Sequence, residues 1–278
     1  MILIIQYYKV NYENHPQDLI NKRQKEINVC LEHNLNNTSI TEIHILFESN
    51  EDEKYMHTQG FDTSHSNFNK IKPYFLGSRL TYQSILNYAS IKLVNKWCIY
   101  MHSDLYLNHI NVSSLQASIE ELYTKSEKNV YALTAHHPTN CPKRGIRCGC
   151  TRQWFTKQGL RTPTIDGFIF KSPLNTDLIT NANHIVHRMG AENRMIYLFR
   201  KYGYTITCPH MIFYTIHQHL VKIFAPQHST WVEMSGECKP LEYYQQIHAQ
   251  QSNLPYEQKV VGGGIPFYDG TVEIVDKL

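Results

Sequence analysis

Charged residues are scarce in this sequence, and long apolar runs are missing. Charged residues make up 18% of the 278 residues, and the formal net charge is only +3. This balance argues against a disordered chain and against a nucleic-acid binder built on a basic face. The opening MILIIQYYKV is too short to cross a membrane, and it lacks the features of a signal peptide. We therefore expect no nucleic-acid partner, no transmembrane segment and a place in the cytoplasm, which for a viral protein is the cytoplasm of its host.

Glycine-rich phosphate-binding motifs are also missing. No G-x-G-x-x-G follows the first apolar stretch, and no P-loop occurs anywhere in the chain. Dinucleotide-dependent enzymes and P-loop NTPases are therefore disfavoured. The seven cysteines are an odd number and include no C-x-x-C pair. Free thiols in a reducing compartment are thus favoured over a disulfide framework.

One cysteine cluster has the ligand types of a structural zinc site. It lies in the basic stretch 136–163 and consists of His136, His137, Cys141, Cys148 and Cys150. Four nitrogen and sulfur ligands from one loop can hold Zn²⁺. The C-x6-C-x-C spacing is not that of a standard zinc finger or ribbon, so free thiols in a basic loop are favoured. Structural zinc stays open as an alternative.

Strand and helix patterns alternate along most of the chain. Apolar stretches predict strands at 2–8, 43–47, 97–101, 130–134, 167–170 and 205–208. Helical spacing predicts helices at 19–31, 82–93, 115–122 and 192–202, whereas the polar stretch 50–73 predicts a loop with at most a short strand. The alternation predicts an α/β fold with a mainly parallel central sheet flanked by helices. We expect a single domain, residues 1–225 with an insertion at 136–163, and a C-terminal extension, 226–278, packed on it.

The strand predicted at 97–101 ends abruptly in polar residues. His102, Ser103 and Asp104 follow directly after the apolar run. Aspartate is rarely buried without a partner, so Asp104 either caps the turn after the strand or holds a charged group. In α/β sheets, ligands bind beyond the carboxyl ends of the strands. Ligand binding is therefore the favoured hypothesis for Asp104.

The order of these pieces resembles the GT-A type of nucleotide-sugar glycosyltransferase, family 2-like, including small viral and bacterial members. The matching stretches are LIIQYY, SRLTYQSILNYA, WCIYMHSDLYLN, IDGFIFKSP, MGAENRMIYLFRKYGYTI and IHQH. The resemblance implies a Rossmann-like nucleotide-binding domain that uses a nucleoside diphosphate sugar, a UDP- or GDP-sugar, as donor. It further implies a hexosyl- or pentosyltransferase that inverts the anomeric centre and takes a glycan or glycoprotein as acceptor.

A divalent cation, Mn²⁺ or Mg²⁺, is part of what the resemblance implies. In the family, an acidic motif after the corresponding strand binds the cation, which stabilises the charge that develops on the leaving diphosphate. Here the motif has one carboxylate, in Asp104. The resemblance makes Asp104 and His102 metal ligands, with His217 or His219 completing the shell.

Two carboxylates compete for the role of general base. Glu192, at the start of a predicted helix, resembles the acidic residue that inverting GT-A enzymes present to the acceptor hydroxyl. A carboxylate in a first helical turn is also favoured by the helix dipole alone. Asp166 is the competing candidate, and Glu192 is slightly favoured. Candidate acceptor contacts beside them are Gly167, Asn193 and Arg194.

Further donor contacts are expected at three places. Gln6, Tyr7 and Tyr8 end the first strand, where the family holds the nucleotide base, and a tyrosine there either stacks on the base or belongs to the core. Arg79 either pairs with the donor phosphates or forms a salt bridge at a helix start. The remaining members of the donor-binding set are His102, Ser103 and Asp104.

Three other functions stay open. A sugar-nucleotide pyrophosphorylase is disfavoured because no glycine-rich signature follows the first strand. A non-catalytic zinc-binding interaction protein would be built around 136–163. A protein that binds a nucleotide sugar without chemistry stays open because the 102–104 motif has a single carboxylate.

Overall fold

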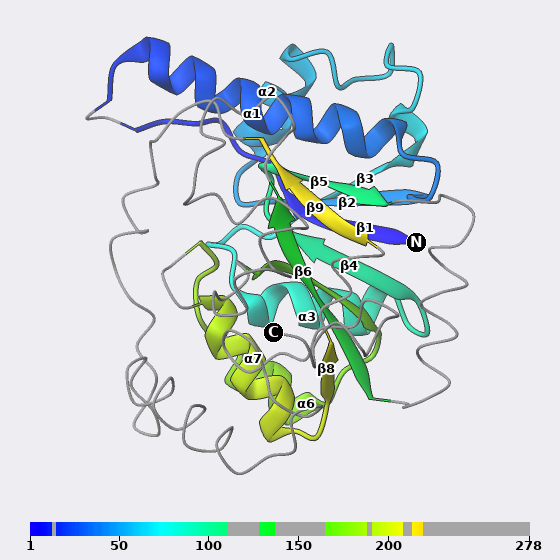
Figure 1. Ribbon diagram of the computed structural model, residues 1–278. Coiled ribbons are helices and arrows are strands. Elements are labelled where there is room, and N and C mark those ends of the chain that lie inside the picture. The colour runs from blue at the N-terminus through cyan, green and yellow to red at the C-terminus, as the bar shows by residue number, and fades with distance from the viewer. Residues whose placement is uncertain (13–14, 110–127, 137–164, 188–190, 208–212, 219–278) are drawn as a thin grey trace, which may run out of the picture.

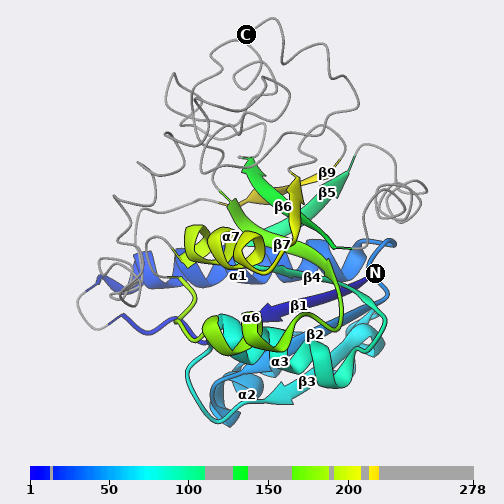
Figure 2. The ribbon, with the colours of Figure 1, turned by 90° about the horizontal axis from the view of Figure 1, so that it is seen from below.

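The computed structural model describes residues 1–12, 15–109, 128–136, 165–187, 191–207 and 213–218 (Figure 1). These residues form a nine-stranded sheet with helices on both of its faces (Figure 2). The strands are β1 (Ile2–Gln6), β2 (Glu42–Phe47), β3 (Ile71–Phe75), β4 (Trp97–Met101), β5 (Leu105–His109), β6 (Asn129–His136), β7 (Ile165–Lys171), β8 (Thr205–Thr207) and β9 (Phe213–His217). The helices are α1 (Gln17–Asn36), α2 (Asn50–Thr58), α3 (Tyr82–Lys92), α6 (Thr176–Asn181) and α7 (Ala191–Lys201).

The sheet is mixed, and its first half is parallel. The strand order is β3-β2-β1-β4-β7-β6-β9-β5, with β8 paired to β6 beside this path. Strands β1, β2, β3 and β4 are parallel to one another, whereas β7 runs antiparallel to both β4 and β6. β8 and β9 are parallel to β6, and β5 is antiparallel to β9. The prediction of an α/β fold with a mainly parallel sheet is confirmed.

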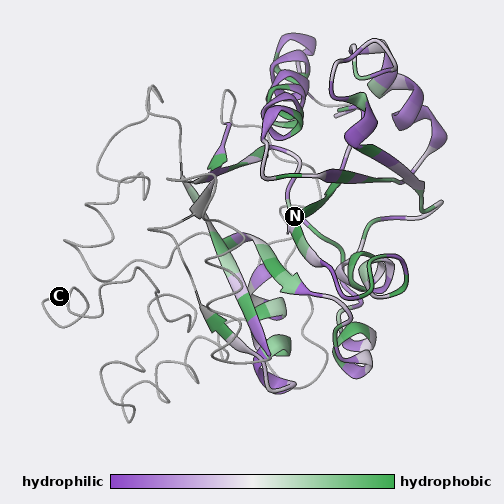
Figure 3. Ribbon diagram, turned by 90° about the vertical axis from the view of Figure 1, so that its right-hand side faces the viewer, coloured by the Kyte–Doolittle hydropathy of each residue, from purple (hydrophilic) through white to green (hydrophobic). Residues whose placement is uncertain are grey.

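Each face of the sheet carries its own apolar core, because successive strand residues point to opposite sides. In β1, Leu3 and Ile5 pack with α1 and α2, whereas Ile2 and Ile4 pack with α3, α6 and α7. Every residue of β1 is buried, as a parallel strand between two helix layers requires. Hydrophilic residues prevail on α1 and α2, and apolar residues prevail along the inner strands (Figure 3). No helix in the described part of the chain has both the length and the apolarity needed to cross a membrane.

The prediction of a loop with at most a short strand over 50–73 is wrong where α2 lies, whereas the start of β3 agrees with the short strand. Helix α2 begins with a cap, in which the backbone N–H of Asp52 donates to Ser49 Oγ at 3.2 Å. Three acidic residues in its first turn suit the helix dipole. The helix shows no apolar periodicity because Met56 is its only buried residue.

Strand β5 has an unusual partner in the helix layer. The side chain of Asn34 on α1 is buried, its Nδ2 donates to Leu105 O at 3.0 Å, and its Oδ1 accepts from Leu107 N at 3.0 Å. One amide thus satisfies both backbone groups, as a neighbouring strand would. The predicted helix at 115–122, nearly all of the insertion and the C-terminal extension lie outside the described residues.

The direction in which strands are added to the sheet reverses after β3. From β1 the chain adds β2 and then β3 on one side, and α3 then carries it back to place β4 on the other side of β1. The carboxyl ends of β1 and β4 therefore flank a topological switch point. Ligands of α/β proteins bind at such points.

Candidate active site at the carboxyl end of β4

The antiparallel pairing of β4 with β7 brings two predicted site segments together. Met101 is opposite Gly167, and the next backbone N–H, that of His102, donates to Asp166 O at 3.2 Å. A Cβ atom on Gly167 would lie 2.6 Å from Tyr100 O, so only glycine permits this approach of the two strands. Gly167 therefore allows the backbone of Asp166 to lie beside that of His102.

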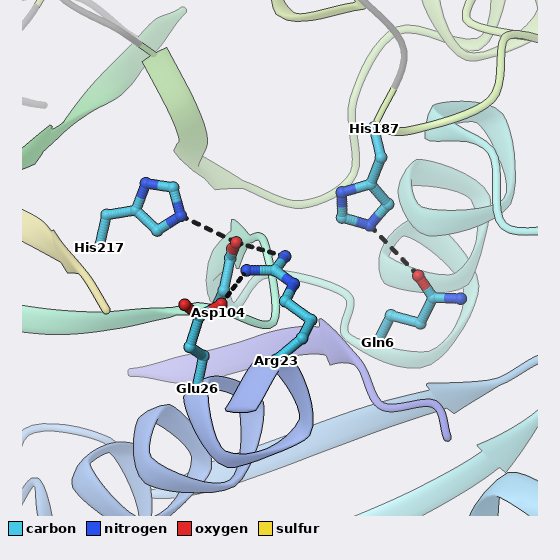
Figure 4. A network of polar contacts seen from close by, with 6 residues as sticks. All are labelled: Gln6, Arg23, Glu26, Asp104, His187 and His217. Atoms are coloured by element: carbon cyan, nitrogen blue, oxygen red, sulfur yellow. Dashed lines mark hydrogen bonds and ion pairs between the residues drawn. The ribbon is translucent and has the colours of Figure 1, made fainter. Parts of the chain in front are cut away.

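Asp104 holds charged groups. Its Oδ2 lies 2.6 Å from Nη2 of Arg23 and 2.9 Å from Nε2 of His217, as Figure 4 shows. Nη1 of the same guanidinium pairs with Glu26, which is 0% exposed. Within the described residues the Asp104 carboxylate accepts from no backbone N–H. The alternative in which this side chain caps the turn therefore does not hold.

Burial and charge act against each other at Asp104. Burial alone would raise the pKa of this carboxyl group, but the Arg23 guanidinium and then His217 outweigh it and hold the pKa well below its usual range. Burial likewise opposes the charged form of His217, and Asp104 outweighs it, so that the pKa of His217 is raised. Asp104 is consequently ionised at neutral pH.

His102 is turned toward the acceptor candidates. Its Nε2 lies 3.1 Å from Oε1 of Glu192, an ion-pair distance without the alignment of a hydrogen bond. The hydroxyl of Tyr82 donates to the same oxygen at 3.1 Å. Burial disfavours the imidazolium, yet Glu192 outweighs burial and raises the pKa of His102 to about 9. Burial is also outweighed at Glu192, where His102 lowers the pKa.

Asp166 differs from the other carboxylates of the site. In the described part of the structure its side chain accepts no hydrogen bond and forms no ion pair. Burial is the largest influence on it and raises its pKa, against the opposing effect of His102. Asp166 is therefore the carboxylate best able to accept a proton from a neutral ligand.

The carboxyl end of β1 carries a second polar group. Nε2 of Gln6 donates to Oε1 of Glu48 at 2.9 Å, and Leu80 N donates to the same oxygen at 2.8 Å. Oε1 of Gln6 in turn lies 3.3 Å from Nε2 of His187 (Figure 4). The ring of His187 lies 4.4 Å from that of His102, measured between centroids. Gln6 and His187 thus connect the end of β1 to the end of β4.

The other expected donor residues have different surroundings. Tyr7 is fully buried, and its hydroxyl donates to Asn28 Oδ1 at 2.7 Å, so it has the core position that the sequence left as an alternative. Tyr8 is half-buried and packs against the same core. Arg79 is exposed. Ser103 is buried, and its Oγ has no partner among the described residues.

Among the acceptor candidates, Arg194 is buried with part of its guanidinium unpaired in the described structure. It is 5% exposed, its guanidinium lies 5.3 Å from the ring centre of Tyr197, and Nη1 has no hydrogen-bond partner in the described structure. The side chain of Asn193, His219 and the cysteines of the predicted zinc cluster lie outside the described residues.

The described residues do not fit a divalent cation as they stand. Oδ2 of Asp104 already has two donors, and His102 faces Glu192 instead of Asp104. No group of three or more histidine, cysteine, aspartate or glutamate side chains in the described part of the chain is arranged to hold a metal ion. A cation on Asp104 would also lie next to a buried guanidinium, which would repel it.

Several site residues were not singled out from the sequence. They are Arg23, Glu26, Glu48, Tyr82 and His187. Glu48 is the one with a usable signal, since an acidic residue at the end of the second strand often serves nucleotide binding in α/β folds. Arg23 and Glu26 resemble any surface pair three residues apart on a helix, and only the fold shows that Arg23 meets Asp104.

No family model and no curated protein matches this sequence. Among solved structures, the chain is similar to a Bacillus anthracis protein assigned as a glucose-1-phosphate thymidylyltransferase, in complex with sucrose, at 12% identity and a TM-score of 0.44, over 77% of this chain and 89% of that one. It is similar to the mannosyltransferase PcManGT from Pyrobaculum calidifontis, in complex with GDP-Man and Mn²⁺, at 11% identity and a TM-score of 0.46, over 90% of this chain and 60% of that one. It is also similar to residues 1–349 of TarS from S. aureus, at 12% identity and a TM-score of 0.41, over 77% of this chain and 59% of that one. Likenesses of this extent identify no activity.

Proposed function

We propose that this protein is a glycosyltransferase that moves a sugar from a nucleoside diphosphate sugar, a UDP- or GDP-sugar, to a hydroxyl group of a glycan, with inversion. The observation that carries the proposal is the position of the polar cluster. Asp104, His102 and Asp166 meet at the carboxyl end of β4, beside Gln6 at the end of β1. This is the switch point of the sheet, where a nucleotide is expected.

The donor half of the proposal rests on the two strand ends. Glu48, with Gln6 beside it, offers a carboxylate acceptor for ribose hydroxyls or for a base N–H. Ser103 has a buried hydroxyl without a partner among the described residues, so it is available to hydrogen-bond a ligand. The imidazoles of His102 and His217, whose pKa values are both raised by neighbouring carboxylates, lie at the same strand end and can donate to a diphosphate.

The acceptor half rests on the unpaired carboxylate. In the proposed step, Asp166 takes the proton of an acceptor hydroxyl while that oxygen attacks the anomeric carbon. The bond from this carbon to the diphosphate oxygen breaks, and the nucleoside diphosphate leaves with both electrons. Sequence analysis slightly favours Glu192 as the base. The contacts favour Asp166, because Glu192 already pairs with His102 and Tyr82. Glu192 then positions His102, and Arg194 contacts the acceptor.

The test is a binding and turnover panel on the full chain. Isothermal titration with UDP, GDP, CDP and ADP, followed by thermal shift with the matching sugar nucleotides, should find one nucleotide that binds and raises the melting temperature. The corresponding sugar nucleotide should then release that nucleoside diphosphate, by transfer or by slow hydrolysis. Asp166→Asn should keep the binding and lose the release. No binding by any nucleotide would reject the proposal.

The same panel separates the alternatives that the sequence leaves open. Binding without any release of nucleoside diphosphate would identify a protein that holds a nucleotide sugar without chemistry. Release of pyrophosphate from a nucleoside triphosphate and a sugar 1-phosphate would identify a pyrophosphorylase. Stoichiometric zinc in protein purified without chelator, together with no nucleotide binding, would favour a zinc-binding interaction protein.

A further inference from the structure

The carboxylate at the end of β4 already has a cation of its own. Arg23 reaches Asp104 from α1, across 81 residues of sequence, with Nη2 at 2.6 Å from Oδ2. Nε2 of His217 approaches the same oxygen at 2.9 Å. Asp104 is 7% exposed, so little water competes for these contacts. The charge of this carboxylate is thus compensated by the protein itself.

Arg23 is held where it is. Its second terminal nitrogen pairs with Glu26, which is fully buried, and the Arg23 side chain is only 13% exposed. If the guanidinium left, the buried Asp104 would lose its main counter-charge and the buried Glu26 would lose an ion-pair partner, which is strongly unfavourable. A divalent ion therefore cannot simply displace Arg23 from Asp104.

Binding of a divalent ion at a position beside Arg23 is also unfavourable. Hard cations such as Mn²⁺ and Mg²⁺ take about six ligands, mostly oxygen. Of the nearby carboxylates, Glu26 faces the guanidinium, Glu192 is occupied by His102 and Tyr82, and Asp166 alone has no partner among the described residues. The described residues supply no group of three ligands, and the guanidinium charge repels the ion at short range.

We infer that Arg23 is the resident cation of this site and takes the place on Asp104 that a divalent metal would otherwise take, so that a nucleoside diphosphate binds here without Mn²⁺ or Mg²⁺. The inference rests on the proposed function for its ligand. The side chains that contact the diphosphate are then the imidazoles at this strand end, those of His102 and His217. Asp104 serves to orient Arg23 and His217 and does not ligate a metal.

The experiment has one arm that needs no nucleotide. Mn²⁺ is titrated into the wild-type full chain, and free Mn²⁺ is followed by its electron paramagnetic resonance signal. We expect no stoichiometric uptake. Uptake of one equivalent by the wild-type protein would overturn the inference whatever nucleotide binding shows.

The second arm compares the affinities of UDP and GDP in EDTA and in excess Mn²⁺ by isothermal titration. For whichever of the two binds, we expect dissociation constants within about twofold of each other. A larger loss of affinity in EDTA would overturn the inference. If neither nucleotide binds in either condition, the proposed function fails, and the Mn²⁺ titration still decides the place of Arg23.

A pair of variants tests the cause. Arg23→Gln frees both Asp104 and Glu26 from the guanidinium, so that two carboxylates and water can ligate the ion, and it should create Mn²⁺ uptake that the wild-type protein lacks. Lys22→Gln removes the same charge from the neighbouring position of α1, where Lys22 is exposed and pairs only loosely with Asp18, and it should bind no Mn²⁺. Circular dichroism establishes that both variants are folded. If Arg23→Gln does not fold, the two wild-type measurements decide the question alone.

Discussion

At the residue scale, four carboxylates near the end of β4 have three kinds of environment. Asp104 and Glu26 share one guanidinium, Glu192 faces an imidazole and a phenol, and Asp166 has no partner among the described residues. Burial raises the pKa of Asp166, whereas His102 outweighs burial and lowers the pKa of Glu192. These surroundings make Asp166 the candidate base, whereas Asp104 and Glu192 position the cationic side chains beside them.

The first prediction concerns the two candidate bases. Asp166→Asn should lower kcat by about 10³-fold with little change in donor affinity, because loss of a general base typically costs 10²- to 10⁴-fold. Glu192→Gln should lower kcat only about tenfold, because it removes a residue that positions His102 and leaves the base in place. Steady-state kinetics on the donor that the binding panel identifies, with titration of donor affinity, measure both effects. A larger loss in Glu192→Gln than in Asp166→Asn would return the role of base to Glu192.

The second prediction concerns pH and His102. Burial opposes the charged imidazole, but Glu192 raises its pKa from an ordinary 6.5 to about 9 in the folded protein. The stabilisation is therefore complete below about pH 6.5 and is lost as the pH rises through about 9. The free energy of unfolding, measured in urea between pH 6 and pH 10, should fall by at most about 3 kcal/mol from this group.

His102→Gln provides the control for this pH effect. It removes the titrating group, so its unfolding free energy should vary less over that range than that of the wild-type protein. Equal pH dependence in the two proteins would show that Glu192 does not hold His102 in its charged form.

At the scale of single elements, helix α1 does more than cover the sheet. Its buried face carries Ile27 and Leu31 into the core, and it also presents Arg23 to Asp104 and Asn34 to β5. These two polar contacts position the segment that follows β4, because β5 begins at Leu105, directly after Asp104. A helix can thus fix the geometry of a site to which it contributes none of the residues expected from the sequence.

The third prediction tests the contact between α1 and β5. Asn34→Ala should lower the free energy of unfolding by about 2–4 kcal/mol, because it leaves Leu105 O and Leu107 N buried without their partner. Urea denaturation measures the change. Asn36→Ala, two residues along the same helix, removes only exposed hydrogen bonds and should cost less than about 0.5 kcal/mol. Similar losses in both variants would refute the assigned role of Asn34.

At the scale of the whole molecule, the helix layers and the sheet form two cores that touch the same strands from opposite sides. The site lies where these layers meet. Arg23 comes from the layer of α1, Glu192 from the layer of α7, and the strand end at 102–104 lies between them. Ion pairs across this junction connect the layers as well as shaping the site.

The fourth prediction is a double-mutant cycle across this junction. Arg23→Gln and Asp104→Asn should each cost about 3–5 kcal/mol of unfolding free energy, because each removes the main counter-charge of a buried group. The double variant should cost clearly less than the sum of the two. The exposed pair of Lys22 and Asp18, 3.5 Å apart on α1, is the reference and should show a coupling of about 0.5 kcal/mol or less. Additive losses for Arg23 and Asp104 would mean that the ion pair does not form in solution.

Elements with a strong local pattern could be predicted from the sequence. The strand predicted at 97–101 has the same bounds in β4, and the amphipathic helix predicted at 82–93 is α3. Helix α2 and strand β5 were missed, because one has a single buried residue and the other is held by a side chain of a distant helix. A sequence pattern predicts a helix or strand only where buried residues recur at regular spacing along it.

By itself the sequence determined the α/β class and the position of Asp104 at the end of a strand, because apolar periodicity and the order of elements are local properties of a chain. It also indicated Asp166 and Glu192 as carboxylates to consider. Only the tertiary structure decided the partners of these groups. Asp104 pairs with Arg23 across 81 residues, and Tyr82 meets Glu192 across 110. A buried charge is compensated by whatever the fold brings within reach, and that neighbour leaves no repeat or spacing in the sequence.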